Sequence, residues 1–236
     1  MKNNPDGESI DVFAICYNEE AMLPYFIEHY QAMGANITIF DNMSTDKSKE
    51  IILEAGCTYK TFDSNKQIRD DLYLNIKNNC WKNSKADWVI VCDIDELLEI
   101  PFSTKPYSMI NTKGYDMVGL PGTRSGVFNR KYSKHIMFRP NMITEINYRP
   151  GCHTSAPQGR IKGSKEQANL LHYKYTSEET VFERHKLYQE RLSPENKANG
   201  WGIEYQNVER EKIAEKFIEL NEKAILIPEE PSVIDF

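Results

Sequence analysis

Residues 88–96 read Trp-Val-Ile-Val-Cys-Asp-Ile-Asp-Glu, an apolar run that ends in three carboxylates. The run is short, uncharged and rich in β-branched residues, which is typical of a strand buried on both faces. Side chains alternate along an extended chain, so Asp93 and Asp95 are expected on one side and Ile94 on the other. The stretch therefore predicts a buried strand with two aspartates at its carboxyl end.

Upstream of this strand, strand-like and helix-like patterns alternate along the chain. Strands are expected at residues 10–16, 37–40 and 58–62, and helices at residues 23–33, 44–56 and 67–83. Alternation of this kind predicts an α/β fold of the Rossmann type, with a mostly parallel sheet and helices on both faces. Ligands of such sheets bind beyond the carboxyl ends of the strands, where Asp93 and Asp95 are expected.

The pattern changes after about residue 100, where Gly, Pro and aromatic residues become frequent. Shorter strands are expected at residues 116–120 and 135–139, and amphipathic helices at residues 177–192 and 208–223. We interpret residues 1–236 as a single domain. Residues of about 10–100 form its first half, and residues of about 101–228, with the closing helices, form its second.

The composition excludes several classes of protein. The chain has 236 residues, of which 29 are basic and 35 acidic, and a formal charge of −6, which disfavours a nucleic-acid-binding protein. No apolar stretch approaches the ~18 residues of a membrane-spanning helix, and no signal peptide is recognisable. Five cysteines without a C-x-x-C spacing indicate neither a disulfide framework nor a zinc cluster. We therefore expect a soluble, cytoplasmic protein without a transmembrane segment.

Two carboxylates at the end of a buried strand are well placed to bind a hard divalent cation. A cation there would neutralise the charge that develops on a departing diphosphate. Asp93 and Asp95 are therefore candidate ligands of Mn²⁺ or Mg²⁺. A D-x-D triplet also occurs by chance, and Asp95 with Glu96 suits the first turn of a helix. The triplet alone leaves both alternatives open.

Four motifs in the first hundred residues carry a resemblance to a known family. They are AICYNEE at residues 14–20, IEHY at residues 27–30 followed by Gly34, IFDNMSTD at residues 39–46 and DIDE at residues 93–96. In this order they resemble the family-2-like glycosyltransferases of the GT-A fold. Later segments at residues 134–140, 152–154 and 171–174 are similar as well.

The resemblance implies transfer of a sugar from a nucleotide-diphospho-sugar, most often a UDP-sugar, to a hydroxyl of a glycan or glycoconjugate. It also implies inversion at the sugar carbon and a divalent cation, Mn²⁺ or Mg²⁺. The first half would bind the donor and the second half the acceptor. The residues expected beside the donor are Asn18, Glu19, Asp41, Asn42, Gln67, Arg69, Asp93 and Lys174. Those expected at the metal are Asp93, Asp95 and His172.

Two of these assignments have structural alternatives. Asp41 would contact uracil or ribose, or it would only cap the turn that follows it. His172 would complete the metal site, or it would be a buried histidine of the core. Tyr17 departs from the family pattern, because a Lys or Arg usually precedes the Asn-Glu pair, and one positive charge near the donor is thereby missing.

An inverting transferase needs a base beside the acceptor hydroxyl, and imidazole or carboxylate groups suit that role. The candidates are His153, Glu145 and Glu96. For His153 the alternative is a loop histidine with a local hydrogen bond.

Two other functions remain open from the sequence. One is metal-dependent nucleotidyl or phosphoryl transfer, which also uses paired aspartates but for which the chain lacks a G-x-x-x-x-G-K-[ST] loop. The other is a carbohydrate-binding module that keeps the fold without turnover.

Overall fold

The computed structural model describes residues 4–229 and 232–233. The first-half elements are β1 (Ile10–Cys16), α1 (Leu23–Ala32), β2 (Asn36–Asp41), α2 (Ser48–Glu54), β3 (Thr58–Thr61), α3 (Asp70–Asn79), β4 (Trp88–Asp93) and β5 (Glu96–Glu99). The later strands are β6 (Met109–Val118), β7 (Ser125–Phe128), β8 (Met137–Phe138), β9 (Ile143–Glu145), β10 (Gln158–Gly159), β11 (Gly163–Tyr175), β12 (Ile225–Leu226) and β13 (Ser232–Val233). The later helices are α4 (Glu178–Arg191), α5 (Pro194–Ala198) and α6 (Arg210–Lys223), with short 3₁₀ turns η1 (Arg130–Tyr132), η2 (Pro150–Cys152) and η3 (Ile203–Tyr205).

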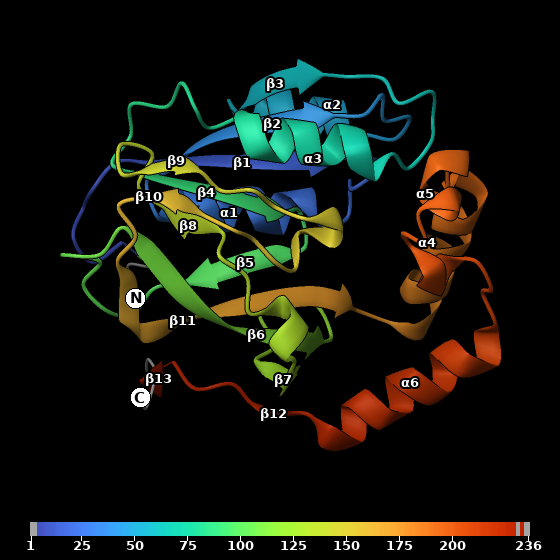
Figure 1. Cartoon of the computed structure of the whole chain (residues 1–236). Helices are drawn as coiled ribbons and strands as arrows, with labels where there is room; N and C mark the ends of the chain where they lie inside the picture. The colour runs from blue at the N-terminus through green and yellow to red at the C-terminus, as the bar shows by residue number, and fades with distance from the viewer. Residues whose placement is uncertain (1–3, 230–231, 234–236) are drawn as a thin grey trace.

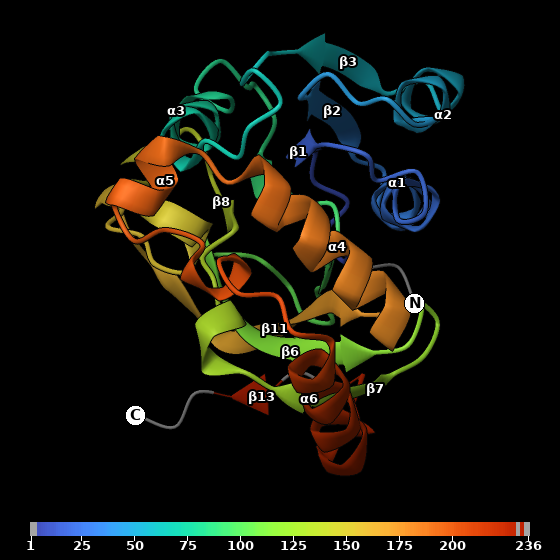
Figure 2. The same cartoon turned by 90° about the vertical axis from the view of Figure 1, so that its right-hand side faces the viewer.

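The first four strands form the parallel part of the sheet in the order β3-β2-β1-β4. Ile15 of β1 stands opposite Phe40 of β2 on one side and Asp93 of β4 on the other. Helices α1 and α2 cover one face of these strands and α3 covers the other (Figure 2). The α/β fold with helices on both faces is thus confirmed, and its strand order brings the ends of β1 and β4 together.

The core explains why these residues form strands. Val12 and Ala14 of β1 pack into the cluster beneath α1, whereas Phe13 between them packs into the cluster beneath α3. In β4, residues 88–92 are all buried, as expected for a strand covered on both faces. Phe26 of α1 is 0% exposed, and a side chain of this kind contributes about 1.5–3 kcal/mol when fully buried.

The second half is a mixed sheet joined to the first by β8, which pairs antiparallel with both β4 and β6. β6 runs parallel to β11 and antiparallel to β7. The strand expected at 116–120 in fact begins at Met109, and the strand expected at 135–139 is reduced to β8. The polar residues at the start of β6 hid the strand. Asn111 there hydrogen-bonds Ser164, and a Cβ on Gly114 would lie 2.2 Å from the Tyr132 backbone.

Two helices begin later than the sequence patterns predict. The Asp41 carboxylate accepts a hydrogen bond from the Ser44 amide, and Asp46 accepts one from the Ser48 amide, so the chain turns before α2. The Ile68 amide donates to the Arg191 carbonyl at 2.7 Å, which keeps the chain extended before α3. In both cases, hydrogen bonds outside the helix decide where it starts.

The C-terminal helices place a wall beside the strand ends. β11 leads into α4, which lies with α5 beyond the carboxyl ends of β1 and β2 (Figure 1). Ser177 caps α4 by accepting a hydrogen bond from the Thr180 amide at 3.1 Å. No helix within residues 4–229 is long and apolar enough to cross a membrane.

Candidate active site

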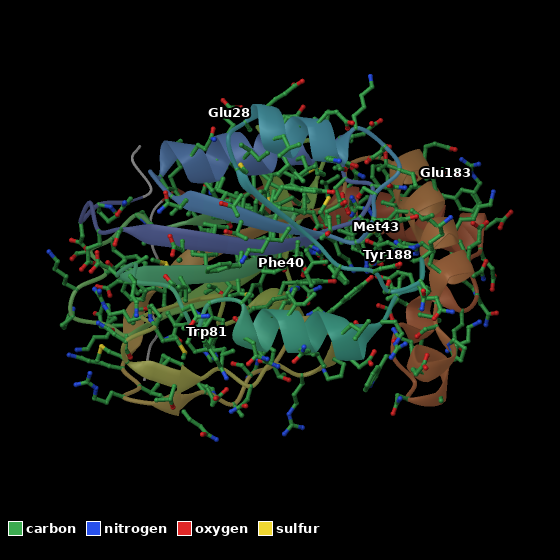
Figure 3. All side chains as sticks on the ribbon, turned by 90° about the horizontal axis from the view of Figure 1, so that it is seen from above. Glu28, Phe40, Met43, Trp81, Glu183 and Tyr188 are labelled. Atoms are coloured by element: carbon green, nitrogen blue, oxygen red, sulfur yellow. The ribbon has the colours of Figure 1, made fainter. Side chains whose placement is uncertain are left out.

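A cavity of about 430 Å³ lies at the carboxyl ends of β1 and β4. Its walls come from α3, β11, α4 and the segments 150–153 and 196–205. Tyr188 of α4 points toward the strand ends, whereas Glu183 of the same helix points outward (Figure 3). The volume suits a ligand of nucleotide size, and the location is the one at which open α/β sheets bind ligands.

Asp93, the first aspartate of the D-x-D triplet, is held by two buried lysines. Lys77 of α3 contacts its Oδ1 atom, and the Nζ atom of Lys134 lies 3.2 Å from its Oδ2 atom. Burial raises the pKa of Asp93, but Lys77 and Lys134 together lower it well below its ordinary value. The carboxylate is therefore ionised, and protein cations neutralise its charge.

Glu96 contacts both Lys134 and the backbone of Asp93. Its side chain is 0% exposed and its Oε1 atom lies 2.5 Å from Nζ of Lys134, whose side chain is 2% exposed. The other oxygen, Oε2, accepts a hydrogen bond from the Asp93 amide at 3.1 Å. Asp95 and Glu96 do not start a helix, because a turn at residues 94–95 leads directly into β5. Glu96 thus orients Lys134 and the end of β4.

Asp95, the second aspartate, has a different set of partners. Its Oδ2 atom accepts a hydrogen bond from Nη1 of Arg184 at 2.9 Å and lies 3.5 Å from Nε2 of His172. The Nη2 atom of Arg184 also lies 3.7 Å from Glu19, which follows β1. Burial raises the pKa of Glu19 to about 7, because Arg184 offsets the loss of hydration only in part. Glu19 and Asp95 thus share one arginine at the cavity wall.

His172 lies on β11 between two carboxylates. Its Nε2 atom faces Asp95, and its Nδ1 atom lies 3.3 Å from Oδ1 of Asp116 on β6. Burial lowers the pKa of His172, but Asp95 and Asp116 outweigh this effect and raise it to about 9. The ring of Tyr132 packs over the imidazole with centroids 4.1 Å apart. The side chain is therefore buried, and yet it also lines the cavity.

The side chains that could bind a divalent cation match such a site only in part. Within residues 4–229, no group of three or more His, Cys, Asp or Glu side chains is arranged to hold a metal ion. Asp95 and His172 are adjacent, and Oδ1 of Asp95 takes part in neither of the contacts that Oδ2 makes. Two protein ligands of this kind suffice when a substrate and water supply the others. Asp93 fits less well, because lysines engage both of its oxygens.

His153 and Lys174 also line the cavity. The Nδ1 atom of His153 lies 3.1 Å from the Lys131 carbonyl, so this nitrogen carries the proton and Nε2 is left as the acceptor. The pKa of His153 is lowered to about 4. Burial is the main cause, and the positive charge of Lys134 adds to it. Gly151 is required beside it, because its φ is +74° and a Cβ would lie 2.8 Å from the imidazole ring.

Several predicted donor residues do not line the cavity. Asn18, Asp41, Asn42, Gln67 and Arg69 all lie outside its wall. Arg69 is paired with Asp71 at 2.7 Å, and Oδ1 of Asn18 accepts a hydrogen bond from the Thr45 amide at 2.8 Å.

Asp41 and Asn42 are buried and engaged in hydrogen bonds of their own. Asp41 accepts from the Ser44 amide and from the Tyr59 hydroxyl at 2.9 Å, as in the turn-capping alternative. The Asn42 amide group donates to the Tyr73 hydroxyl at 3.0 Å, and Tyr73 does line the cavity. The two side chains therefore support the wall behind the site.

Two of the three candidate bases are also outside the wall. Glu145 ends β9 and is paired with Lys82 at 2.8 Å, with its side chain 40% exposed. Glu96 is fully buried against Lys134. Of the three, only His153 faces the cavity.

Most cations of the cavity wall were not expected from the sequence, in which only Lys174 was a candidate. Lys77 on α3 and Arg184 and Arg191 on α4 all line the cavity. Arg184, Tyr188 and Arg191 recur at helical spacing, and this stripe was the one available signal.

Comparisons with known proteins place the chain in a family. Residues 11–163 match the sequence model of the family described as "Glycosyl transferase family 2". The chain therefore belongs to glycosyl transferase family 2, as the motifs predicted. No curated protein sequence matches it.

Solved structures show weaker similarity. A structure of S. aureus TarS 1–349 aligns with a TM-score of 0.47 and 13% identity over 78% of this chain and 65% of that chain. A longer TarS structure aligns with a TM-score of 0.46 and 12% identity over 89% of this chain but 43% of that chain. Glucosyl-3-phosphoglycerate synthase from Mycobacterium tuberculosis, in complex with Mn²⁺, UDP and glucosyl-3-phosphoglycerate, aligns with a TM-score of 0.33 and 14% identity over 49% and 47% of the two chains. This chain thus spans less than two thirds of each of these proteins.

Proposed function

We propose that this glycosyltransferase takes a sugar from a UDP-sugar and transfers it, with inversion, to a hydroxyl group of a glycan or glycoconjugate. The observation that carries the proposal is the pairing of Asp95 with Arg184 and His172 inside a cavity of nucleotide size. Membership of the glycosyltransferase family favours sugar transfer over nucleotidyl or phosphoryl transfer.

The proposed cation is Mn²⁺ or Mg²⁺, with Asp95 and the deprotonated imidazole of His172 as its protein ligands. Binding of the cation would displace the proton that His172 carries at pH 7. When bound, such a cation compensates the negative charge that develops on the diphosphate leaving group. Imidazole ligation favours Mn²⁺ over Mg²⁺. Asp93 would then act through Lys77 and Lys134, which it holds at the cavity wall.

Of the residues predicted beside the donor, Glu19, Asp93 and Lys174 line the cavity and lie within reach of a ligand there. Asn42 serves the same site indirectly, because it positions the hydroxyl of Tyr73. Asp41 holds the turn that precedes α2. We assign these last two residues as positioning residues for the donor pocket.

His153 is the proposed base. Its imidazole is neutral at pH 7, because its pKa is lowered to about 4, and Nε2 is the free acceptor nitrogen. A neutral imidazole at the cavity wall can take the proton of an acceptor hydroxyl as that oxygen attacks the sugar carbon.

A screen of nucleotide-sugars by thermal unfolding tests the proposal. Bound ligand raises the melting temperature by mass action, so UDP-sugars with Mn²⁺ are expected to give the largest increase. GDP- and ADP-sugars serve as controls. An equal response to all bases would remove the uridine assignment, and no response to any nucleotide would contradict the proposed function.

A further inference from the structure

The lysine and arginine side chains that line the cavity fall into two groups. Lys77, Lys134 and Arg184 form ion pairs with carboxylates of the site. Lys174 and Arg191 line the same cavity but form no ion pair in the described part of the chain. They lie instead on tyrosine rings. The cavity thus contains two positive groups without a carboxylate partner.

Arg191, the last residue of α4, is the more unusual of the two. The residue is 7% exposed, and its Cζ atom lies 3.1 Å from the centre of the Tyr17 ring. Its Nε atom donates to the Lys66 carbonyl at 2.9 Å, but its buried Nη2 atom has no hydrogen-bond partner among the described residues. A buried guanidinium nitrogen without a partner costs free energy unless a ligand supplies the acceptor.

Lys174 is the second cation, and its side chain is half-buried. Lys174 lies on β11, two residues after His172. Its Nζ atom lies 5.8 Å from the centre of the Tyr205 ring. Burial lowers the pKa of Arg191, whereas the ion-paired Arg184 on the same helix has a raised pKa. The cavity therefore places two cations, neither with a carboxylate partner among the described residues, where a ligand can reach them.

Arg191 lies beside the residue that follows β1. Tyr17 directly follows β1, and the guanidinium of Arg191 covers its ring. A positive charge is therefore present beside the end of β1, although it comes from helix α4 and not from residue 17 itself.

We propose that Arg191 binds the diphosphate of the donor, with Lys174 as the second cation. Each of the two phosphates in a nucleotide-sugar carries a negative charge, and the two unpaired cations match them. Guanidinium groups bind phosphate oxygens through charge-assisted hydrogen bonds, which Nη2 of Arg191 has available. The assignment rests on the proposed function, since it takes the ligand to be a nucleotide-sugar.

Calorimetric titration of the whole chain with UDP, CDP and ADP in the presence of Mn²⁺ tests the inference. Arg191→Met and Arg191→Gln both remove the charge, and Gln retains a donor for the Lys66 carbonyl. Arg160→Met is the matched control, because Arg160 is exposed and outside the cavity wall. Loss of a charge-assisted hydrogen bond is expected to weaken binding of all three diphosphates by a common factor of about ten to a hundred.

A double variant moves the charge to residue 17. It combines Tyr17→Lys with Arg191→Met, or with Arg191→Gln should the Met variant not fold. It is expected to recover at least part of the lost affinity. Unchanged affinity in both single variants would overturn the inference. So would a loss confined to UDP, because Arg191 would then contact the base and not the phosphates. If the unaltered chain binds none of the three nucleotides, the proposed function itself fails, which distinguishes the two outcomes.

Discussion

The Nζ atom of Lys134 lies 3.2 Å from Oδ2 of Asp93, although the lysine side chain is only 2% exposed. The same ammonium contacts the fully buried Glu96, so one lysine joins β4, β5 and the segment before β8. This contact separates the roles of the two aspartates. Asp93, whose side chain is 39% exposed, is held by two buried lysines, and Asp95 retains an oxygen outside its contacts with Arg184 and His172.

The first prediction concerns the stability of this network. Lys134→Met leaves the carboxylates of Glu96 and Asp93 without their buried partner, and we expect unfolding free energy to fall by about 3–5 kcal/mol. Urea denaturation measures the change. Lys82→Met is the matched control, because its pair with Glu145 has side chains 34% and 40% exposed. That variant is expected to lose about 0–1 kcal/mol. Equal losses in the two variants would contradict the network.

The second prediction separates the two aspartates in metal binding. Asp95→Asn is expected to weaken Mn²⁺ affinity in the presence of UDP more than Asp93→Asn does, because both oxygens of Asp93 already contact lysines. Electron paramagnetic resonance of free Mn²⁺ measures the affinity. Excess EDTA is expected to abolish turnover, and added Mn²⁺ to restore it. Full turnover in EDTA would refute the metal assignment.

The third prediction concerns His172. His172→Gln is expected to reduce Mn²⁺-dependent UDP binding at least about tenfold, because it replaces a metal ligand. Asp116→Asn alters the partner of Nδ1 and is expected to reduce it by a smaller factor. Circular dichroism should show that the His172 variant remains folded. A variant that unfolds easily but binds Mn²⁺ and UDP normally when folded would make His172 a core residue only.

The fourth prediction is a pH dependence of kcat. The pKa of His153 falls from 6.5 in the unfolded chain to about 4 in the fold, so its imidazole is neutral at pH 7. At saturating donor and Mn²⁺, we expect the contribution of His153 to kcat to stay constant on acidification until the pH approaches about 4, where this base becomes protonated. Protonation of His153 also lowers the free energy of unfolding as the pH falls from 6.5 towards 4, because the unfolded chain takes up the proton first.

His153→Gln isolates this effect. The variant is expected to lose about 10²–10⁴-fold in kcat at pH 7, the usual contribution of a general base. Glu145→Gln is expected to keep the activity of the unaltered chain, because Glu145 lies outside the cavity wall. A His153 variant with normal kcat would transfer the role of base to another residue.

The local fold was predictable where one pattern dominated. Residues 10–16 form β1 with the predicted bounds, and the apolar run before Asp93 forms β4. The starts of α2 and α3 were not predictable, because they depend on hydrogen bonds such as that from the Ile68 amide to the Arg191 carbonyl. No periodicity in the sequence records a contact between segments so far apart.

The candidate site was predictable in its carboxylates and in Lys174, but not in its other cations. Asp93 ends β4 and Asp95 follows it, so their position is visible in the sequence. Lys77 and Arg191 lie on charge-rich helices, where an exposed surface is the ordinary interpretation. Only the packing of α3 and α4 around the strand ends turns these side chains toward the cavity.

The most direct test of the proposed sugar transfer is the identity of the nucleotide product. The whole chain is incubated with UDP-sugars and Mn²⁺, and the nucleotides are separated by chromatography. We predict release of UDP from at least one UDP-sugar, and loss of that release in Asp95→Asn. Release of UMP or inorganic phosphate in place of UDP, or equal UDP release by the Asp95 variant, would contradict it.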